Sequence, residues 1–381
     1  MSKEQNIARE LIEFIWESPS VFHVTDTIRK ELLQAGFQEL KEQDVWQLES
    51  DHGYFVVRND SSVIAFYVPD KEMSGFHVLA GHGDSPTFKV KENPELTVEE
   101  KYIRLNTEKY GGMIHSTWLD RPLSVAGRII VRGENNLPQT MLVNVDKDLL
   151  VIPNLAIHMN REVNKGYEYN PQIDLLPLMG LGNKKDAKDL LLKEVAEAAG
   201  IKKEDILGHD LFLYVRERGR IIGAGEEFVL SPRLDDLQCV HSGMKAFLST
   251  KPKHYINVLA VFDNEEVGST TAQGAGSTLL KDTFLRIGEA LNWTEEDRCR
   301  MMAGSFMISA DNAHAVHPNH PEKADPSNRP YLGGGIVIKY HGGQKYTTDG
   351  VSAAAMKLWC EKAKVPYQVF YNRSDMAGGS T

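Results

Sequence analysis

The stretch Ile256–Ser269 reads "INVLAVFDNEEVGS". Its first seven residues carry no charge and are mostly apolar, which predicts a buried strand. Directly after that strand, Asp263, Glu265 and Glu266 place three carboxylates within four residues. Acids this close raise one another's pKa unless a positive group lies among them, and the nearest lysines lie upstream of the strand. The sequence therefore predicts that a cation from elsewhere in the fold, or a metal ion, meets the end of this strand.

Apolar runs of strand length recur along the chain, and in its last third they alternate with helix candidates. Two helices are expected at the start, over residues 3–16 and 24–35. The alternation predicts an α/β domain with a mostly parallel sheet and helices on both faces. The middle of the chain is different, because short strands and turns dominate there. We therefore expect one discontinuous domain over residues 1–85 and 228–381, interrupted by a β-rich insertion over residues 86–227.

The composition is that of a globular protein, with 381 residues, 41% hydrophobic and 25% charged. A formal net charge of −10 disfavours nucleic acids and anionic membrane surfaces as partners. The three cysteines form no C-x-x-C pair, and no apolar run approaches transmembrane length. The N-terminus has no apolar core of a signal peptide. These features predict a reduced, soluble, cytoplasmic protein.

Polar side chains that could bind a metal gather at the ends of apolar runs, where open α/β sheets place their ligands. In "AGHGDSP", His82 and Asp84 face the same way on an extended chain. The carboxylate can then orient the imidazole as a metal ligand. Taken alone, this H-x-D pattern is weak, and a surface histidine in a turn explains it equally well.

Two further acidic pairs follow the same rule. In "SPRLDDL", Asp235 or Asp236 is either the N-cap of the next helix or a carboxylate that bridges two metals. In "DNEEVGS", adjacent side chains diverge, so one of Glu265 and Glu266 can bind a metal while the other acts as general base. A solvated acidic loop is the alternative, which the preceding buried strand disfavours.

Histidines complete the set. The stretch "ISADNAHAVHPNHP" holds Asp311 and three histidines, of which at least one faces the substrate or the surface. His158 stands alone in the β-rich insertion, where its spacing favours a structural role. Imidazole and carboxylate donors suit Zn²⁺, Mn²⁺ or Co²⁺. Two such ions about 3.5–4 Å apart, sharing a carboxylate and a water, form a hydrolytic centre.

Several motifs in order give the chain a close resemblance to the aspartyl aminopeptidase family of dinuclear zinc metallopeptidases. The resemblance runs from the N-terminal helices to the last residue and implies a zinc-peptidase-like catalytic domain whose insertion mediates assembly. Family members resemble tetrahedral dodecamers built from dimers. The matching stretches are "AGHGDSP", "YGGMIHSTWLDRPLSVAGRI", "IPNLAIHMNREVN", "SPRLDDL", "DNEEVGS", "SFMISADNAHAVHPN" and "GGST".

The resemblance implies removal of the N-terminal amino acid from a peptide by water activated between two metals. Against the spacing argument, it implies that His158 reaches a neighbouring subunit's active site. A preference for N-terminal Asp or Glu would need a cation in the pocket; Lys339 and Lys345 are available, and the resemblance favours Lys339. An ordinary surface lysine is the alternative, so the preference stays open. The resemblance also implies metal-binding roles: His82, Glu266 and Asp311 would be ligands, and Asp235 would be the bridging carboxylate. It implies that Asp84 orients His82 and that Glu265 is the general base. It assigns substrate binding to His314 and Tyr346.

The C-terminus departs from the family pattern. The chain ends at "RSDMAGGST", whereas family members continue and supply a last histidine ligand. We therefore expect this chain to lack the C-terminal segment and to bind its second metal weakly. Two alternatives to an aminopeptidase stay open on the residues alone: a metal-dependent deacylase or amidohydrolase of N-acyl amino acids, and a non-catalytic assembly protein on a peptidase scaffold.

Overall fold

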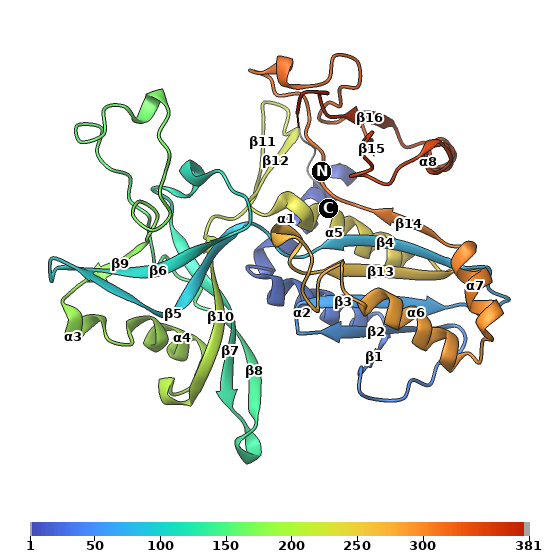
Figure 1. Cartoon of the computed structure of the whole chain (residues 1–381), viewed down its shortest axis with the longest axis horizontal. Helices are drawn as coiled ribbons and strands as arrows, with labels where there is room; N and C mark the ends of the chain where they lie inside the picture. Colours follow the sequence, from blue (N-terminus) through green and yellow to red (C-terminus); the bar gives the residue numbers. More distant parts are fainter. Residues whose placement is uncertain (1, 377–381) are drawn as a thin grey trace. The chain divides into compact units, whose positions relative to one another are not determined.

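The computed structural model describes residues 2–376, so the "GGST" stretch lies outside the described residues. The chain divides into two compact units, Met1–Ala310 and Asp311–Thr381, called unit 1 and unit 2 below. Unit 1 contains two six-stranded sheets, sheet A and sheet B (Figure 1). Because both sheets belong to unit 1, the predicted domain boundaries at residues 86 and 227 stay a prediction.

Sheet A is a mixed sheet in which β13 lies between β3 and β4, so the apolar run from Ile256 occupies an interior strand. Three of the five strand pairings are parallel and two are antiparallel. The predicted α/β class with a mostly parallel sheet is therefore confirmed. In spatial order, the strands are β1 (Gln38–Leu40), β2 (His52–Arg58), β3 (Ser62–Val68), β13 (Ile256–Phe262), β4 (Phe76–His82) and β14 (Phe306–Ser309).

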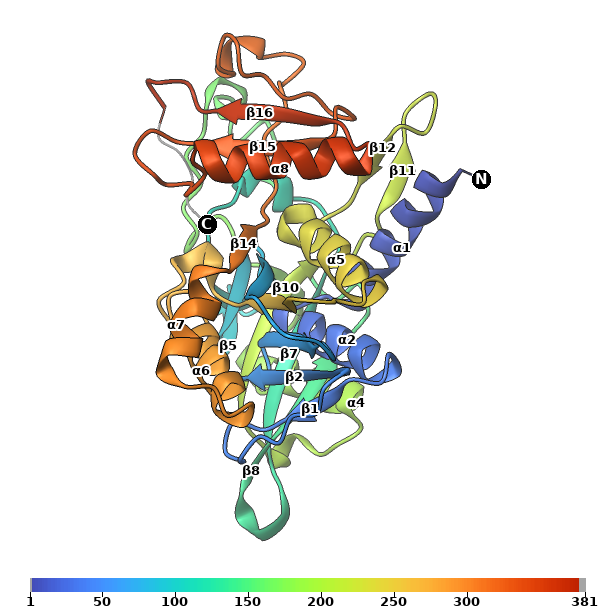
Figure 2. The ribbon, with the colours of Figure 1, turned by 90° about the vertical axis from the view of Figure 1, so that its right-hand side faces the viewer.

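Helices cover both faces of sheet A, as predicted, because successive residues of a strand point to opposite faces. On β13, Leu259 and Val261 pack against one group of helices, while Val258 and Ala260 pack on the other side. Figure 2 shows the two groups on opposite sides of the strands. The first group is α1 (Lys3–Glu17), α2 (Val21–Gln34) and α5 (Leu234–Ser249), and the second is α6 (Leu279–Ala290) and α7 (Glu295–Ala303).

The two opening helices differ in how they begin. A capping box of Ser2 and Gln5 starts α1, close to the predicted position. Helix α2 begins at Val21, three residues earlier than predicted, because Val21 and Phe22 are buried. Its N-cap residue, Ser20, makes no capping bond with its side chain. The Ser20 hydroxyl instead lies 2.8 Å from Nδ1 of His23.

Sheet B confirms the β-rich insertion, since all its strand pairings are antiparallel. Its core includes Val125, Ile129, Leu211 and Leu213, and a helix packs against it through Leu191. A separate hairpin of β11 (Arg220–Ile222) and β12 (Phe228–Leu230) follows. The strands of sheet B, in spatial order, are β8 (Pro138–Asn144), β7 (Leu123–Arg132), β10 (Ile206–Val215), β5 (Thr87–Val98), β6 (Tyr102–Tyr110) and β9 (Leu178–Leu181), and its helices are α3 (Lys184–Ala187) and α4 (Leu190–Ala199).

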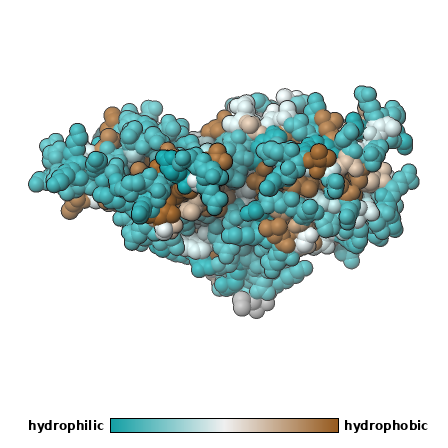
Figure 3. Space-filling view, turned by 90° about the horizontal axis from the view of Figure 1, so that it is seen from below, coloured by the Kyte–Doolittle hydropathy of each residue, from teal (hydrophilic) through white to brown (hydrophobic). Residues whose placement is uncertain are grey.

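Unit 2 contains a small crossover motif. Its parallel strands are β15 (Ile336–Tyr340) and β16 (Tyr367–Tyr371), and α8 (Gly350–Ala363) connects them, as parallel pairing requires. Within residues 2–376, no helix combines the length and the apolar character needed to cross a bilayer. On the face shown in Figure 3, apolar side chains form separate patches on a mainly hydrophilic surface.

The close approach of β7 and β10 in sheet B generates a prediction. Gly127 has φ +159°, and a Cβ atom there would lie 2.0 Å from the carbonyl oxygen of Asp210. We expect Gly127→Ala to lower the free energy of unfolding by about 2–3 kcal/mol, because backbone atoms of a paired strand cannot move aside. Chemical denaturation monitored by circular dichroism measures the change.

The matched control is Gly208→Ala, on the neighbouring strand. A Cβ atom there meets nothing within 4 Å. We expect this control to change the free energy of unfolding by no more than about 0.5 kcal/mol. Equal unfolding midpoints for the two variants would contradict the packing described for sheet B.

Candidate metal centre

The site is built where two parallel strands end side by side. Strands β4 and β13 are neighbours in sheet A, with His82 opposite Phe262. The amide of Gly83 donates to the carbonyl oxygen of Phe262 over 2.8 Å, which holds the two strand ends together. Functional side chains of open α/β sheets gather at such carboxyl ends. His82 from β4 therefore meets Glu265 and Glu266, which follow β13 in a short 3₁₀ turn.

His82 is buried and surrounded by acids. Its Nε2 lies 3.6 Å from Oδ1 of Asp235 and 3.8 Å from Oε2 of Glu265. Its Nδ1 lies 3.3 Å from Oδ1 of Asp84. Burial by itself lowers the pKa of His82, but the bonds to Asp235 and Asp84 outweigh burial and raise this pKa to about 11. The imidazole is thus held in a strongly negative environment.

The Asp84 carboxylate links several parts of the site. Its side chain is only 2% exposed, and it accepts a hydrogen bond of 2.7 Å from the hydroxyl of Tyr110. The backbone amides of Glu265 and Glu266 each donate to it over 3.1 Å. Because Nδ1 of His82 also lies beside Oδ1 of Asp84, this one carboxylate sets the positions of both glutamates relative to the imidazole. Its orienting role stays a prediction, which this geometry supports.

Tyr110 is a residue that sequence reasoning missed. It ends β6 of sheet B, and its hydroxyl also accepts a hydrogen bond of 2.9 Å from Nδ2 of Asn264. Burial, with the nearby charge of Asp84, raises the pKa of Tyr110, which keeps the phenol a neutral donor. The following Gly111 has φ +75°, and a Cβ atom there would lie 2.9 Å from Cβ of Glu266. A glycine pair after a strand indicates such close approach, and it was the one available signal.

Asp235 and Asp236 lie at the start of α5 and differ in exposure and in the groups they contact. Both aspartates have non-helical backbone angles before the regular part of the helix, and the peptide bond between them is cis. The Asp235 side chain is 57% exposed and faces His82. Asp236 is fully buried, and its Oδ2 accepts a hydrogen bond of 3.2 Å from the amide of His82. Asp236 therefore holds the backbone of β4, a contact that the sequence did not predict.

The three acids after β13 are divided between two environments. Asp263 is buried, which raises its pKa to about 6, and its Oδ1 accepts a hydrogen bond of 2.6 Å from the amide of Asn264. Glu266 lies on the His82 side. Burial, followed by the negative charges of Asp235, Asp84 and Glu265, raises its pKa to about 8. A nearby divalent cation would stabilise the charged form of Glu266.

The donor set of unit 1 fits a zinc ion. It offers one imidazole nitrogen and the carboxylates of Asp235 and Glu266 around it, which is a combination that zinc accepts. The buried partner of His82, Asp84, also matches the usual arrangement in which a carboxylate orients a ligating histidine. The assignment of these residues as metal ligands stays a prediction.

The other predicted residues belong to the β-rich insertion and to unit 2. His158 is exposed, in the segment of unit 1 between β8 and β9 that projects from sheet B (Figure 1). In unit 2, Nζ of Lys339 lies 3.3 Å from Oδ2 of Asp311 and 5.4 Å from the ring centroid of Tyr346. His314 is exposed in the same unit. Unit 2 thus brings together Asp311, Lys339 and Tyr346, and the roles of all five residues stay predictions.

Comparisons with known proteins all identify aminopeptidases or structures similar to this chain. Residues 14–381 match the family model described as aminopeptidase I zinc metalloprotease (M18). The chain is 50% identical over 385 residues to the probable M18 family aminopeptidase 2 of Clostridium novyi (strain NT), covering 100% of this chain and 89% of that relative. A chain in the cryo-EM structure of the Ape4 and Nbr1 complex matches with a TM-score of 0.94 and 35% identity, covering 99% of this chain and 77% of that one. The S. cerevisiae mApe1 dodecamer matches with a TM-score of 0.85 and 27% identity, over 97% and 86%.

The bond from Tyr110 to Asp84 generates a prediction. Tyr110→Phe removes only the hydroxyl, and with it the shortest hydrogen bond to the Asp84 side chain. We expect metal affinity to fall by about 10–100-fold, because a less fixed Asp84 orients His82 poorly. Competition with a chromogenic chelator measures the affinity.

Tyr67→Phe is the matched control, since it deletes a hydroxyl that bonds to Asp51 at the surface of unit 1. We expect this variant to bind metal like the wild type. If both variants retain the wild-type affinity, Tyr110 has no positioning role.

Proposed function

Because the chain belongs to the M18 family of aminopeptidase I zinc metalloproteases, it is a metalloaminopeptidase, and we propose that two zinc ions act in its catalytic centre. His82, Asp235, Glu266 and Asp311 would hold them, with Asp235 shared between the ions. Mn²⁺ and Co²⁺ suit the same donors. The observation that carries this proposal is the position of Nε2 of His82, 3.6 Å from Asp235 and 3.8 Å from Glu265.

When bound, the metal ions would supply the positive charge that lowers the pKa of a water molecule and stabilises a developing oxyanion. Glu265 would accept a proton from the attacking water and deliver it to the nitrogen of the departing peptide. Two features of Glu265 support this role. Its side chain is 17% exposed, so it is sheltered yet reachable, and its amide is held 3.1 Å from Asp84. Asp84 acts through His82 and is a positioning residue.

Residues of unit 2 would bind the substrate. Lys339 is the group that would bind an acidic side chain at the N-terminus of the peptide, because a cation and a carboxylate form strong, directional hydrogen bonds. Its Nζ already lies 3.3 Å from Asp311, the proposed metal ligand, and donates to the carbonyl oxygen of Asn312 over 2.8 Å. A substrate carboxylate at Lys339 would thus lie beside a metal ligand. Tyr346 and His314 would contribute further polar contacts to the substrate.

We also propose that the chain self-associates through its insertion, as a dimer or a dodecamer in which His158 reaches a neighbouring copy's active site. The solved structure of S. cerevisiae mApe1 is a dodecamer, and this chain resembles it over 97% of its length. Apolar side chains on the segment that carries His158 support the proposal, because large exposed apolar groups often mark interfaces. Leu155, Met159 and Ile173 are 55%, 69% and 67% exposed. A cytoplasmic location is likewise kept as a proposal.

The family match favours an aminopeptidase over the deacylase and the non-catalytic assembly protein. A substrate panel tests the proposed chemistry. Aminoacyl substrates with Asp, Glu or Leu at the N-terminus are compared with N-acetyl amino acids, before and after chelation and after return of Zn²⁺, Mn²⁺ or Co²⁺. We expect turnover of aminoacyl substrates only with metal present. Metal-dependent hydrolysis of the N-acetyl compounds alone would support the deacylase instead.

Glu265→Gln tests the general base in the same assay. We expect kcat to fall by about 10²–10⁴-fold with an unchanged metal content, because the amide cannot accept the proton. Glu296→Gln makes the same chemical change at an exposed position of α7 and should leave kcat unchanged. A Glu265→Gln enzyme with wild-type kcat would remove Glu265 from the mechanism.

The panel also tests the acidic specificity. Lys339→Gln should lower kcat/KM for Asp and Glu substrates by about tenfold or more relative to Leu. A wild-type enzyme that hydrolyses Leu substrates and leaves Asp and Glu substrates untouched would refute the acidic preference while leaving the aminopeptidase assignment in place.

Self-association is tested by size-exclusion chromatography with light scattering. We expect a dimer or a dodecamer of this chain, and we expect Met159→Asp to shift the mass towards the monomer, because a charge cannot be buried in an apolar interface at low cost. A monomer over the whole concentration range would contradict the proposed assembly.

A further inference from the structure

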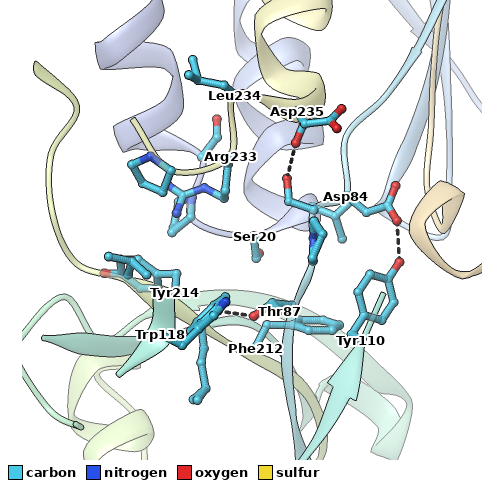
Figure 4. A pocket seen from close by; sticks show the side chains of 18 of the residues that line it. Ser20, Asp84, Thr87, Tyr110, Trp118, Phe212, Tyr214, Arg233, Leu234 and Asp235 are labelled. Carbon is cyan, nitrogen blue, oxygen red and sulfur yellow. Dashed lines mark hydrogen bonds between the residues drawn. The ribbon is translucent and has the colours of Figure 1, made fainter. Parts of the chain in front are cut away.

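A second site is indicated by a cavity of about 310 Å³ within unit 1 (Figure 4). Four runs of consecutive residues contribute to its wall: the residues before and at the start of α2, the segment after β4, the end of β10 in sheet B, and the residues that lead into α5. Tyr110 and residues near Trp118 complete it. Its lining is mainly apolar, with Trp118, Phe212 and Leu213 among the contributors, and includes the hydroxyl-bearing Ser20 and Tyr214. A volume near 310 Å³ is at the lower end of the range for small-molecule pockets, which is about 300–1,000 Å³.

The guanidinium of Arg233 lies in the wall of this cavity. Its Nη2 donates to the carbonyl oxygen of Ile15 over 2.8 Å, whereas its Nε is buried without a hydrogen-bond partner. Within residues 2–376, no carboxylate forms an ion pair with Arg233, and its guanidinium carbon lies 5.7 Å from the ring centroid of Tyr214. A buried donor without a partner, on a cation without a counter-ion, is costly, so this guanidinium is suited to an anion that enters the cavity.

The N-terminus of α2 provides an independent second observation. Helix α2 has 14 residues, and Ser20 and Val21 at its start line the same cavity. Its Ser20 cap makes no side-chain bond to the first amides, and its first turn holds no acidic residue. Free amides and the positive end of the helix dipole favour a bound anion. Two separate parts of the chain, Arg233 and the start of α2, therefore present positive charge to the same cavity.

The acids of the metal centre do not neutralise this charge. Asp84 and Asp235 contribute to the cavity wall, but Figure 4 shows both carboxylates on the side away from Arg233. Asp84 is bonded to Tyr110, and Asp235 lies 3.6 Å from His82. The cavity thus borders the metal centre through Asp84 and Asp235, whose carboxylates point away from Arg233.

We propose that this cavity is a binding site for a small carboxylate, held by Arg233 and by the N-terminus of α2. A carboxylate fits because a guanidinium presents paired N–H donors that match its two oxygens. The apolar lining from Trp118, Phe212 and Leu213 suits a short hydrocarbon portion on the same molecule. The cavity shares Asp84 and Asp235 with the metal centre, but the groups proposed to bind the carboxylate, Arg233 and the first turn of α2, have no role in the proposed catalysis.

Two sources of such a carboxylate are distinguishable. Each aminopeptidase turnover releases a free amino acid, which carries a carboxylate together with an ammonium group. A simple organic acid carries the carboxylate alone. Leucine and acetate represent the two sources, and acetamide is the neutral counterpart of acetate.

Isothermal titration calorimetry on the metal-loaded full chain tests the proposal. We expect acetate to bind at least about tenfold more tightly than acetamide, because only acetate makes charge-assisted hydrogen bonds. Binding of leucine as well would identify the reaction product as a ligand, and binding of acetate alone would favour a simple acid. No saturable heat with acetate or leucine, or equal affinities for acetate and acetamide, would overturn the proposal.

Variants locate the site. Arg233→Gln should remove the preference for acetate, whereas Arg216→Gln, a control whose side chain is ion-paired with Asp146 and Asp148, should retain it. Val21→Phe keeps Arg233 and fills the cavity from the first turn of α2, so it should abolish acetate binding even if Arg233→Gln fails to fold. Circular dichroism checks the fold of each variant. Acetate that binds Val21→Phe with wild-type affinity is bound elsewhere, for instance at the metal ions, and that result would refute the assignment.

Discussion

The buried carboxylate of Asp84 is the interaction on which the rest of the site depends. It joins the end of β4, the turn after β13 and the end of β6, which come from three distant parts of the chain. A buried carboxylate is tolerated only when donors surround it, and here a phenol and two backbone amides do so. The same bonds that satisfy Asp84 set the positions of His82, Glu265 and Glu266.

The metal centre and the neighbouring cavity differ in the sign of their charge. In the metal centre, several acids surround His82, whose pKa is raised to about 11, and the pKa of Glu266 is raised to about 8. Such a cluster favours cations, in agreement with membership in a zinc metalloprotease family. In the neighbouring cavity, whose lining is mainly apolar, the positive charge comes from Arg233 and the start of α2. The carboxylates of Asp84 and Asp235, which border both sites, point away from Arg233.

Much of the fold and part of the site could be predicted because their signals are local. An uncharged apolar run predicts β13, and acids directly after it predict polar groups at a strand end. Tyr110 and Asp236 could not be predicted. Tyr110 belongs to another sheet, and its bond to Asp84 depends on how β6 approaches sheet A. Asp236 resembles a helix cap in sequence, yet it is fully buried and holds the amide of His82.

The sequence by itself determined the α/β class, the β-rich insertion, and the placing of acids and histidines at strand ends, since hydrophobic periodicity and residue order are properties of short segments. Only the tertiary structure decided which acids meet. Asp263 and Glu266 are three residues apart, but Asp263 accepts a hydrogen bond from the amide of its neighbour Asn264, whereas Glu266 lies near His82. The tertiary structure also decided that Tyr110 bonds to Asp84 and that Nε of Arg233 is buried without a partner. Burial and hydrogen-bond distance depend on contacts between segments that are far apart in the chain.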